Sequence, residues 1–210
     1  MSDQSLIYSH RALYHAIMRL LYGRHFEARY AAIAAEIPDS VEVIDVCAGD
    51  SYLYLKYLRS KHVNYLALDI SPQLIAWAQR HGVPARQFDA RRDELPIGDV
   101  LVMQASLYQF LPDAAPMIRK LLNAARQRVI ITEPIRNLSD SKNPLLAFIG
   151  RKLTVPVTTD GTYAAQRFTP SSAGQLFRSF ESLDRLTLLP GGREMLGVFR
   201  GQAAHDHAGH

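Results

Sequence analysis

Polar side chains that could bind a ligand stand at the ends of five short apolar runs of this chain. They are, in chain order, Asp45, Asp69, Asp89, Gln104 and Glu133. If these runs are parallel strands, their carboxyl ends meet at one edge of a sheet, which is where such sheets bind ligands. A carboxylate after the second strand can accept two hydrogen bonds from a ribose diol. The step of 24 residues from Asp45 to Asp69 fits the spacing of roughly 20 residues found in nucleotide-binding sheets.

The turn after the first run contains Gly49, between Ala48 and Asp50. Glycine lets backbone N–H groups approach a ligand closely, although an ordinary strand-to-helix turn would also use it. Asp69 precedes Ser71-Pro72, a typical N-cap and first helical position, so it could equally belong to a helix-capping region. The spacing and the context favour the ribose role.

The residues near the other strand ends have similar pairs of interpretations. Asp89 can accept from an adenine amino group while Ile70 or Phe88 packs on the ring, but two arginines follow Asp89, so a surface turn is the alternative. Asp45 could orient the turn instead of contacting a ligand. Cys47 is more often a small buried residue than a nucleophile.

The periodicity of apolar residues places these side chains on alternating strands and helices. A helix is predicted from about Phe26 to Ile37, where apolar residues recur every three or four positions, and Pro38-Asp39-Ser40 ends it. Strands are predicted at 41–47, 65–70, 85–89, 99–105 and 128–132, with helices at 52–60, 71–81 and 114–126. This alternation implies an α/β fold whose parallel sheet is covered by helices on both faces.

The rest of the chain departs from this alternation. The segment 134–167 is long and rich in turn residues, and a connection of that length is usually functional. A helix over 170–180 follows, and then two strands, at 183–189 and 195–199, joined by a glycine turn. The predicted organisation is an N-terminal helical segment or lid at 1–40 and a ligand-binding domain at 41–201 that contains the 134–167 insertion. The tail at 202–210 is expected to be flexible.

Composition excludes several classes of protein. Hydrophobic residues make up 48% and charged residues 21% of the chain, which is typical of a globular domain and not of a disordered one. The single cysteine cannot form an intramolecular disulfide. Neither a secretory signal nor a long apolar run is found, so a soluble cytoplasmic protein is expected. Three histidines in the tail, His205, His207 and His210, lack a scaffold, so no metal site is predicted.

Taken together, these segments resemble the class I S-adenosylmethionine-dependent methyltransferases, from about Phe26 to Gly201. That family has a strand, an acidic residue and a Gly-x-Gly-x-Gly turn where this chain has EVIDVCAGDS, and its second motif resembles YLALDISPQLIAWAQ, with Asp69 as the ribose-binding acid. Its adenine-side acid and fourth strand resemble QFDARRDELPIGDVLVMQASLYQF, and its late helix resembles RFTPSSAGQLFRSF. Only Gly49 keeps its place in the glycine turn, because Cys47 and Ser51 occupy the other two positions.

The resemblance implies a Rossmann-like methyltransferase fold: a mostly parallel seven-stranded sheet with helices on both faces and an antiparallel C-terminal strand pair. It also implies S-adenosylmethionine as the cofactor and in-line methyl transfer to a small-molecule acceptor. The residues implied to hold the cofactor are Asp45, Cys47, Ala48, Gly49, Asp69, Ile70, Phe88, Asp89 and Gln104. A general base is needed only for a protonated acceptor, and its candidates are Tyr108, Glu133 and His15. Glu133 could equally bind a cationic acceptor.

Two other functions fit the sequence less well. Nucleic-acid amino-methyltransferases of the family often have Asn or Asp, two prolines and an aromatic residue where this chain has Gln104-Ala105-Ser106, so no nucleic-acid partner is expected. A nicotinamide-dependent oxidoreductase would need a complete G-x-G-x-x-G turn, which this chain lacks. Two alternatives stay open. One is a degenerate domain acting as a non-catalytic binding module, because glycines are missing. The other is a peripheral lipid methyltransferase, because apolar and basic residues mix in the 134–167 insertion.

Overall fold

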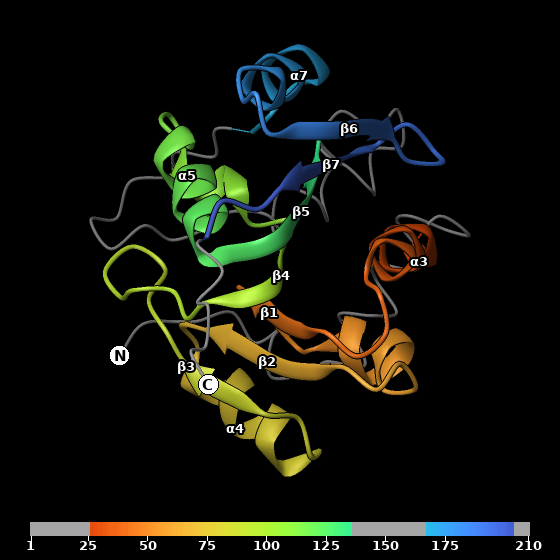
Figure 1. The fold of residues 1–210 in the computed structure, drawn as a ribbon, viewed down its shortest axis with the longest axis vertical. Helices are drawn as coiled ribbons and strands as arrows, with labels where there is room; N and C mark the ends of the chain where they lie inside the picture. Colours follow the sequence, from red (N-terminus) through yellow and green to blue (C-terminus); the bar gives the residue numbers. More distant parts are fainter. Residues whose placement is uncertain (1–25, 136–166, 204–210) are drawn as a thin grey trace, which may run out of the picture.

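The computed structural model describes residues 26–135 and 167–203, which form one sheet with helices on both faces (Figure 1). The sheet has seven strands in the order β3-β2-β1-β4-β5-β7-β6. Strands β1 to β5 pair in parallel, and β7 pairs antiparallel with both β5 and β6. The predicted fold class, including the antiparallel C-terminal pair, is confirmed.

The strands lie close to their predicted positions. Their bounds are β1 Glu42–Val46, β2 Asn64–Asp69, β3 Ala85–Gln87, β4 Gly98–Gln104, β5 Ala125–Pro134, β6 Leu183–Leu188 and β7 Glu194–Arg200. The largest difference is β5, which begins three residues earlier than predicted, directly after a helix. Arg126 looks like part of that helix in sequence, but its guanidinium pairs with Glu42 and Asp99 at the starts of β1 and β4. These contacts hold the segment in the sheet.

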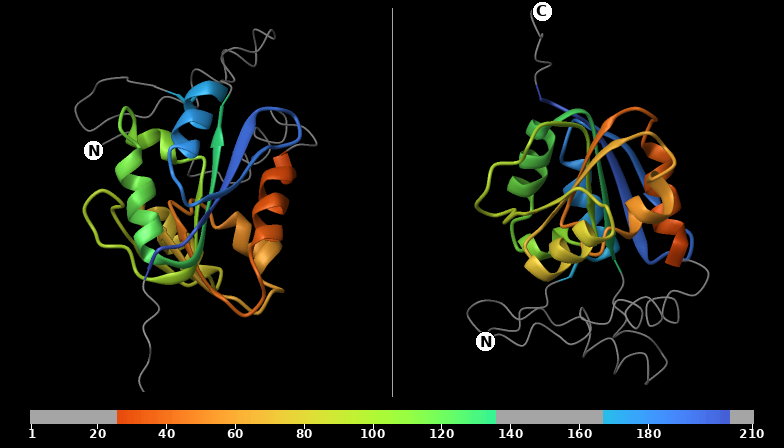
Figure 2. Two further views of the ribbon diagram at one scale, coloured as in Figure 1. Left: turned by 45° about the horizontal axis from the view of Figure 1, so that its top comes forward. Right: turned by 90° about the horizontal axis from the view of Figure 1, so that it is seen from below.

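The helices divide between the two faces (Figure 2). On one face lie α3 (Phe26–Glu36) and a π-helix, η2 (Tyr54–Leu58); on the other lie α5 (Ala115–Ala124) and α7 (Pro170–Arg178). Helix α4 (Pro72–Arg80) adds Ala78 to the α3 face. The prediction of an α-helix at 52–60 is corrected, because most of this segment is a π-helix, which is wider than an α-helix. Sequence analysis also missed a short 3₁₀-helix, η3 (Leu107–Phe110), after β4.

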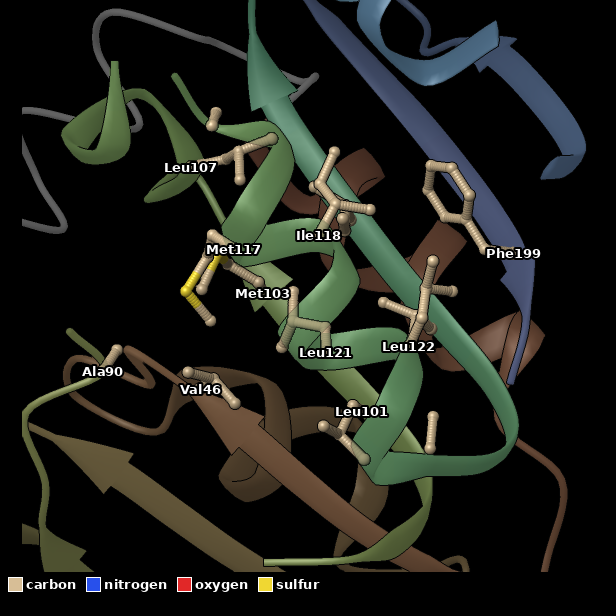
Figure 3. Close-up of a cluster of buried hydrophobic side chains, with 14 of the residues drawn as sticks. Val46, Ala90, Leu101, Met103, Leu107, Met117, Ile118, Leu121, Leu122 and Phe199 are labelled. Carbon is tan, nitrogen blue, oxygen red and sulfur yellow. The ribbon is translucent and has the colours of Figure 1, made fainter. Parts of the chain in front are cut away.

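Strand alternation explains why each face has its own core. Alternate residues such as Ile44, Leu101 and Val129 face α5 and α7, while Val43, Val100 and Ile130 face α3. Figure 3 shows the α5 face, where Met117, Ile118, Leu121 and Leu122 pack on the sheet. A sheet buried on both sides carries apolar residues at nearly every position. The core therefore fixes the register that brings the strand ends together.

Several predicted segments lie wholly or mainly outside the described residues. They are residues 1–25 of the N-terminal segment, which include His15, most of the 134–167 insertion, and the tail beyond 203. The predicted domain organisation therefore stays a prediction. In the part of the chain that is described, no helix is long and apolar enough to cross a membrane, and no cluster of metal-ligating side chains is found.

Gly197→Ala is expected to lower the free energy of unfolding by roughly 1–3 kcal/mol, because an added methyl would overpack the α7 face. A Cβ at Gly197 would lie 2.9 Å from ring atoms of both Phe177 and Phe199. Urea denaturation measures the loss. Adding Phe177→Leu should recover part of it, since the smaller side chain makes room; a Gly197→Ala protein as stable as the wild type would contradict the packing described.

Candidate functional site

The turn after β1 has an alternating backbone conformation. Cys47, Gly49 and Ser51 all adopt positive φ, at 59°, 59° and 55°. These are the three positions at which the resembled family has glycine, the residue that adopts this conformation without steric cost. The turn therefore keeps its shape although two of its three glycines are replaced, and the replacements carry backbone strain.

Gly49 is the open point of this turn. No atom lies within 4 Å of the position that a Cβ would take there, so the backbone faces free space. The Gly49 N–H donates to Asp69 Oδ2 at 2.9 Å, which ties the β1 turn to the end of β2. A ligand could therefore approach the backbone closely at this point.

Asp69 joins two loops through one carboxylate. Its second oxygen accepts from the Ser71 N–H at 2.9 Å, at the start of α4, where the Ser71 side chain caps the helix. Burial raises the pKa of the Asp69 carboxyl, and the N–H groups of Ser71 and Gly49 oppose that rise. Each carboxylate oxygen has a second lone pair, so the capping contact leaves acceptor capacity for a ribose. The two interpretations from sequence are compatible.

Asp45 lies beneath the turn and is 0% exposed. It accepts from the Tyr65 hydroxyl at 2.7 Å and from Gln104 Nε2 at 3.1 Å. Burial raises the pKa of Asp45 to about 7. These contacts join β1, β2 and β4 under the turn, which favours the interpretation that Asp45 orients the turn and does not itself face a ligand.

Cys47 is packed against the core of the α5 face. Burial raises the pKa of its thiol to about 12, helped by the nearby carboxyls of Asp69 and Asp45. The thiol therefore stays protonated near neutral pH and is a poor nucleophile. Its neighbour Ala48 is buried and donates its N–H to the Leu68 carbonyl at 3.0 Å, so Ala48 belongs to the frame of the turn.

The residues expected at the adenine end divide between core and surface. Ile70 is 59% exposed beside Asp69, whereas Phe88 is 4% exposed and packs in the core. Ile70 is therefore the side chain available to an aromatic ring. Asp89 Oδ1 accepts from the Arg91 N–H at 2.9 Å, and the Asp89 N–H donates to Asp93 Oδ2 at 2.8 Å. Asp89 thus closes a turn, as its alternative interpretation proposed, and its side chain stays partly exposed.

A pocket that sequence analysis missed opens beside this turn. It encloses about 340 Å³ between the turn after Asp89, η3 and α5. Arg91 packs over the Phe110 ring at 4.9 Å, and Lys120 Nζ donates to the Ala90 carbonyl oxygen at 2.8 Å. Arg91 was visible in the sequence, but its partner Gln109 lies 18 residues away, and the Lys120–Ala90 contact spans 30 residues.

Glu133 and Tyr108 come together at the ends of β4 and β5. Glu133 is 0% exposed, its Oε2 accepts from the Leu107 N–H at 2.9 Å, and its Oε1 is buried without a partner. Burial raises the pKa of Glu133 to about 8, although nearby Arg167 lowers it. The Arg167 guanidinium lies 3.5 Å from the centre of the Tyr108 ring. Of the three candidate bases, the structure thus places Glu133 and Tyr108 at one edge, and His15 lies outside the described residues.

Ser51→Gly is expected to stabilise the protein by about 1 kcal/mol. The change removes left-handed strain of about 1–2 kcal/mol and a buried unpaired hydroxyl, and these gains exceed the roughly 0.5–1 kcal/mol entropy cost of a new glycine. Ser51 is buried, and its Oγ has no partner. Thermal unfolding of Ser51→Ala separates the two gains, because that variant loses the hydroxyl and keeps the strain. A Ser51→Gly protein less stable than Ser51→Ala would contradict the strain argument.

Comparisons with known proteins identify the fold. No family model matches the chain, and no curated protein matches it. Among solved structures, the magnesium protoporphyrin IX methyltransferase of Synechocystis with bound S-adenosylhomocysteine matches 92% of this chain and 96% of its own, with a TM-score of 0.61 and 15% identity. A possible histamine N-methyltransferase of Thermotoga maritima has a TM-score of 0.62 at 14% identity, over 93% of this chain and 98% of its own. A putative methyltransferase of Haloferax volcanii, in complex with the activator Trm112, reaches 0.65 at 12% identity, over 97% and 100%. The chain therefore has the Rossmann-like fold found in S-adenosylmethionine-dependent methyltransferases.

Proposed function

We propose, from the premise that the chain has this fold, that it binds S-adenosylmethionine and transfers the methyl group to a small-molecule acceptor. One observation supports the proposal most. The turn at Cys47–Ser51 keeps its left-handed alternation, leaves open space at Gly49 and is tied by hydrogen bond to the Asp69 carboxylate. An open backbone beside a carboxylate at the ends of the first two strands is suited to a nucleoside.

The residues present fit this cofactor. A Cβ at Gly49 would project into the free space, Asp69 has acceptor capacity for the ribose hydroxyls, exposed Ile70 can cover the adenine ring, and Asp89 can accept from its amino group. Asp45 and Gln104 brace the turn from below. When bound, the cofactor supplies a methyl group on a positively charged sulfur, which an acceptor lone pair displaces in line.

The chain's own contribution is to position the acceptor, exclude water and receive a proton where the acceptor carries one. Gln104 on β4, expected from the sequence to hold the cofactor, braces the turn through Asp45. The other residues assigned to the cofactor lie on or directly after β1, β2 and β3, so the ends of β4 and β5 remain for the acceptor. Glu133 Oε1 is the buried, unpaired atom at that edge that could take a proton. Its pKa of about 8 lies in the range that suits a general base near neutral pH.

One alternative function is still supported by a specific observation. Cys47 and Ser51 stand in the left-handed positions, so a domain that binds the cofactor without turnover is the main alternative. An oxidoreductase is disfavoured, because the turn lacks the glycine pattern that receives a pyrophosphate. The lipid-methyltransferase variant rests on residues 136–166, outside the described part of the chain.

Calorimetric titration of the full chain with S-adenosylmethionine, S-adenosylhomocysteine and NADH tests the proposal. We expect micromolar binding of the two adenosyl ligands and none of NADH. Binding of NADH alone would overturn the assignment. Binding of both adenosyl ligands with no methyl transfer to a broad panel of acceptors would favour the binding module.

A further inference from the structure

Four of the unpartnered buried side-chain oxygens in the described structure lie near one edge of the sheet, at the ends of β4 and β5 and the start of β7. They belong to Gln104 on β4, Thr132 and Glu133 on β5, and Glu194 on β7, and the atoms are Oε1, Oγ1, Oε1 and Oε2 respectively. Native proteins leave few buried polar groups without a partner, so each such group needs an explanation. A cluster of them suggests a ligand that is complementary to all.

Strand register shows that three of these residues form a row on the α3 face. Gln104 pairs with Thr132, and Thr132 pairs with Leu196, two residues from Glu194. Side chains two residues apart on a strand share a face, so Gln104, Thr132 and Glu194 point to the same side. Gln104 ends β4 and Glu194 begins antiparallel β7. The row therefore lies at the same edge of the sheet as the cofactor residues, on the strands left for the acceptor.

The hydrogen bonds around the row fix what it can accept. Gln104 Nε2 donates to Asp45, which leaves Gln104 Oε1 as an acceptor. Glu194 Oε1 accepts from Arg29 Nη1 of α3 at 3.0 Å, which leaves Oε2. Thr132 Oγ1 can accept as well as donate. All three atoms can thus receive hydrogen bonds.

The charged groups around the row also bear on which ligand it can bind. Three carboxyl groups lie in or beside the row, those of Asp45, Glu133 and Glu194, and two guanidinium groups act on them. Arg29 is paired with Glu194, and Arg167 acts on Glu133. Burial raises the pKa of Asp45 to about 7 and that of Glu133 to about 8, so both are partly or mostly protonated near neutral pH. The carboxylate that can attract a cation is then that of Glu194, whose Oε2 stays unpaired beside its ion pair with Arg29.

We propose that the row of Gln104, Thr132 and Glu194 binds the protonated amino group of the methyl acceptor, so that the acceptor is an amine. A primary ammonium group has three N–H donors and no acceptor, which matches three acceptor oxygens beside carboxyl groups. This inference rests on the proposed function, because it assigns the acceptor of that reaction. Glu133 follows Thr132 in the strand and therefore points to the opposite face of the sheet, so within the row the Glu194 carboxylate, with its unpaired Oε2, is the group that can take the proton that the amine must lose before its lone pair can attack.

The test uses the full chain saturated with S-adenosylhomocysteine and two probe pairs of matched shape: phenethylamine with 2-phenylethanol, and hexylamine with 1-hexanol. Calorimetry at pH 7 should show that each amine binds at least about fivefold more tightly than its alcohol, or about 1 kcal/mol. Equal binding of amine and alcohol would overturn the inference and assign the row to ordered water. Failure of S-adenosylhomocysteine itself to bind is seen in the first titration and overturns the proposed function together with the inference.

Variants show whether the row binds the amino group of the acceptor or the amino group that S-adenosylhomocysteine itself carries. Thr132→Val keeps the shape of a side chain that is fully buried and should weaken phenethylamine binding at least about threefold, with unchanged affinity for S-adenosylhomocysteine. Glu194→Gln should do the same, provided that it folds. Ser182→Ala is the matched control, because Ser182 Oγ is also buried and unpaired. Ser182 pairs through its carbonyl with Arg200, at the far end of β7. An equal loss of S-adenosylhomocysteine affinity in Thr132→Val would place the cofactor's amino group in the row and overturn the inference.

Discussion

Asp69→Ala is expected to weaken the binding of S-adenosylmethionine about tenfold or more while the protein stays folded. The variant removes the acceptor assigned to the ribose hydroxyls, and a charge-assisted hydrogen bond contributes on the order of 2 kcal/mol. It also releases the Gly49 N–H, which Asp69 Oδ2 holds at 2.9 Å. The β1 turn would lose its tie to β2, so affinity falls for two reasons that act together.

Calorimetry measures this affinity, and circular dichroism with thermal unfolding shows whether the variant is folded. Asp69→Asn should fall between the wild type and Asp69→Ala, since its amide keeps one acceptor oxygen. Asp99→Asn is the matched control, because Asp99 also accepts from a backbone N–H, that of Glu42, but at the opposite edge of the sheet. Full cofactor affinity in folded Asp69→Ala would remove the ribose assignment.

Features that depend on local sequence could be predicted. The run of β-branched residues at 41–46 predicts β1, and Ser71-Pro72 predicts the start of α4, which the structure shows with the Ser71 side chain accepting from the Leu74 N–H. Turn residues after each strand predict the edge at which the polar side chains meet. Such signals lie within a few residues of each other, so pattern alone is sufficient.

Features that depend on partners far along the chain could not be predicted. Arg126 belongs to β5 because of partners on β1 and β4. The buried pair of Arg29 and Glu194 joins residues separated by 165 positions. Nothing in the sequence around Glu133 indicates that its carboxylate binds the Leu107 N–H. The role of a polar residue at a strand end is therefore decided by its neighbours in the sheet.

The positive φ angles of Cys47 and Ser51 are a different case. The resemblance marks both as glycine positions, and the structure shows that they keep the glycine conformation. Neither residue type would be chosen for a left-handed position on its own propensity. The surrounding contacts of the turn, including the bond from the Ser51 N–H to the Ala48 carbonyl oxygen at 3.0 Å, hold it in place. A local rule is broken here at the candidate site, where such exceptions concentrate.

The free energy of unfolding is expected to fall as pH rises from about 5 to about 8. Burial raises the pKa of Glu133 from 4.5 to about 8 and that of Asp45 from 3.8 to about 7. Between these limits the folded state holds protons that the unfolded state has released. Stability therefore decreases with pH, by at most about 1.4 kcal/mol per pH unit for each group. The stabilisation is complete below about pH 4 and is lost as pH passes the folded-state pKa values.

Glu133→Gln should flatten this dependence by the contribution of one group, on the order of 3 kcal/mol between pH 5 and pH 8. Glutamine is neutral at every pH, and its amide oxygen can still accept from the Leu107 N–H. Urea unfolding at a series of pH values measures the slope, and Asp45→Asn tests the second group in the same way. A slope that is unchanged in Glu133→Gln would show that the Glu133 carboxyl is not protonated in the folded protein.

The same carboxyl connects stability with the proposed reaction. Glu133 stabilises the fold when protonated, but it can take a proton from an acceptor only when ionised. Under the proposed function, the rate of methyl transfer should therefore rise with pH toward about 8 while the free energy of unfolding falls. Glu133→Gln should lose the rising part of the rate profile and gain a flatter stability profile. Loss of both pH dependences through one substitution would be hard to explain by a purely structural role for Glu133, since loss of packing alone would alter stability without reshaping the dependence of rate on pH.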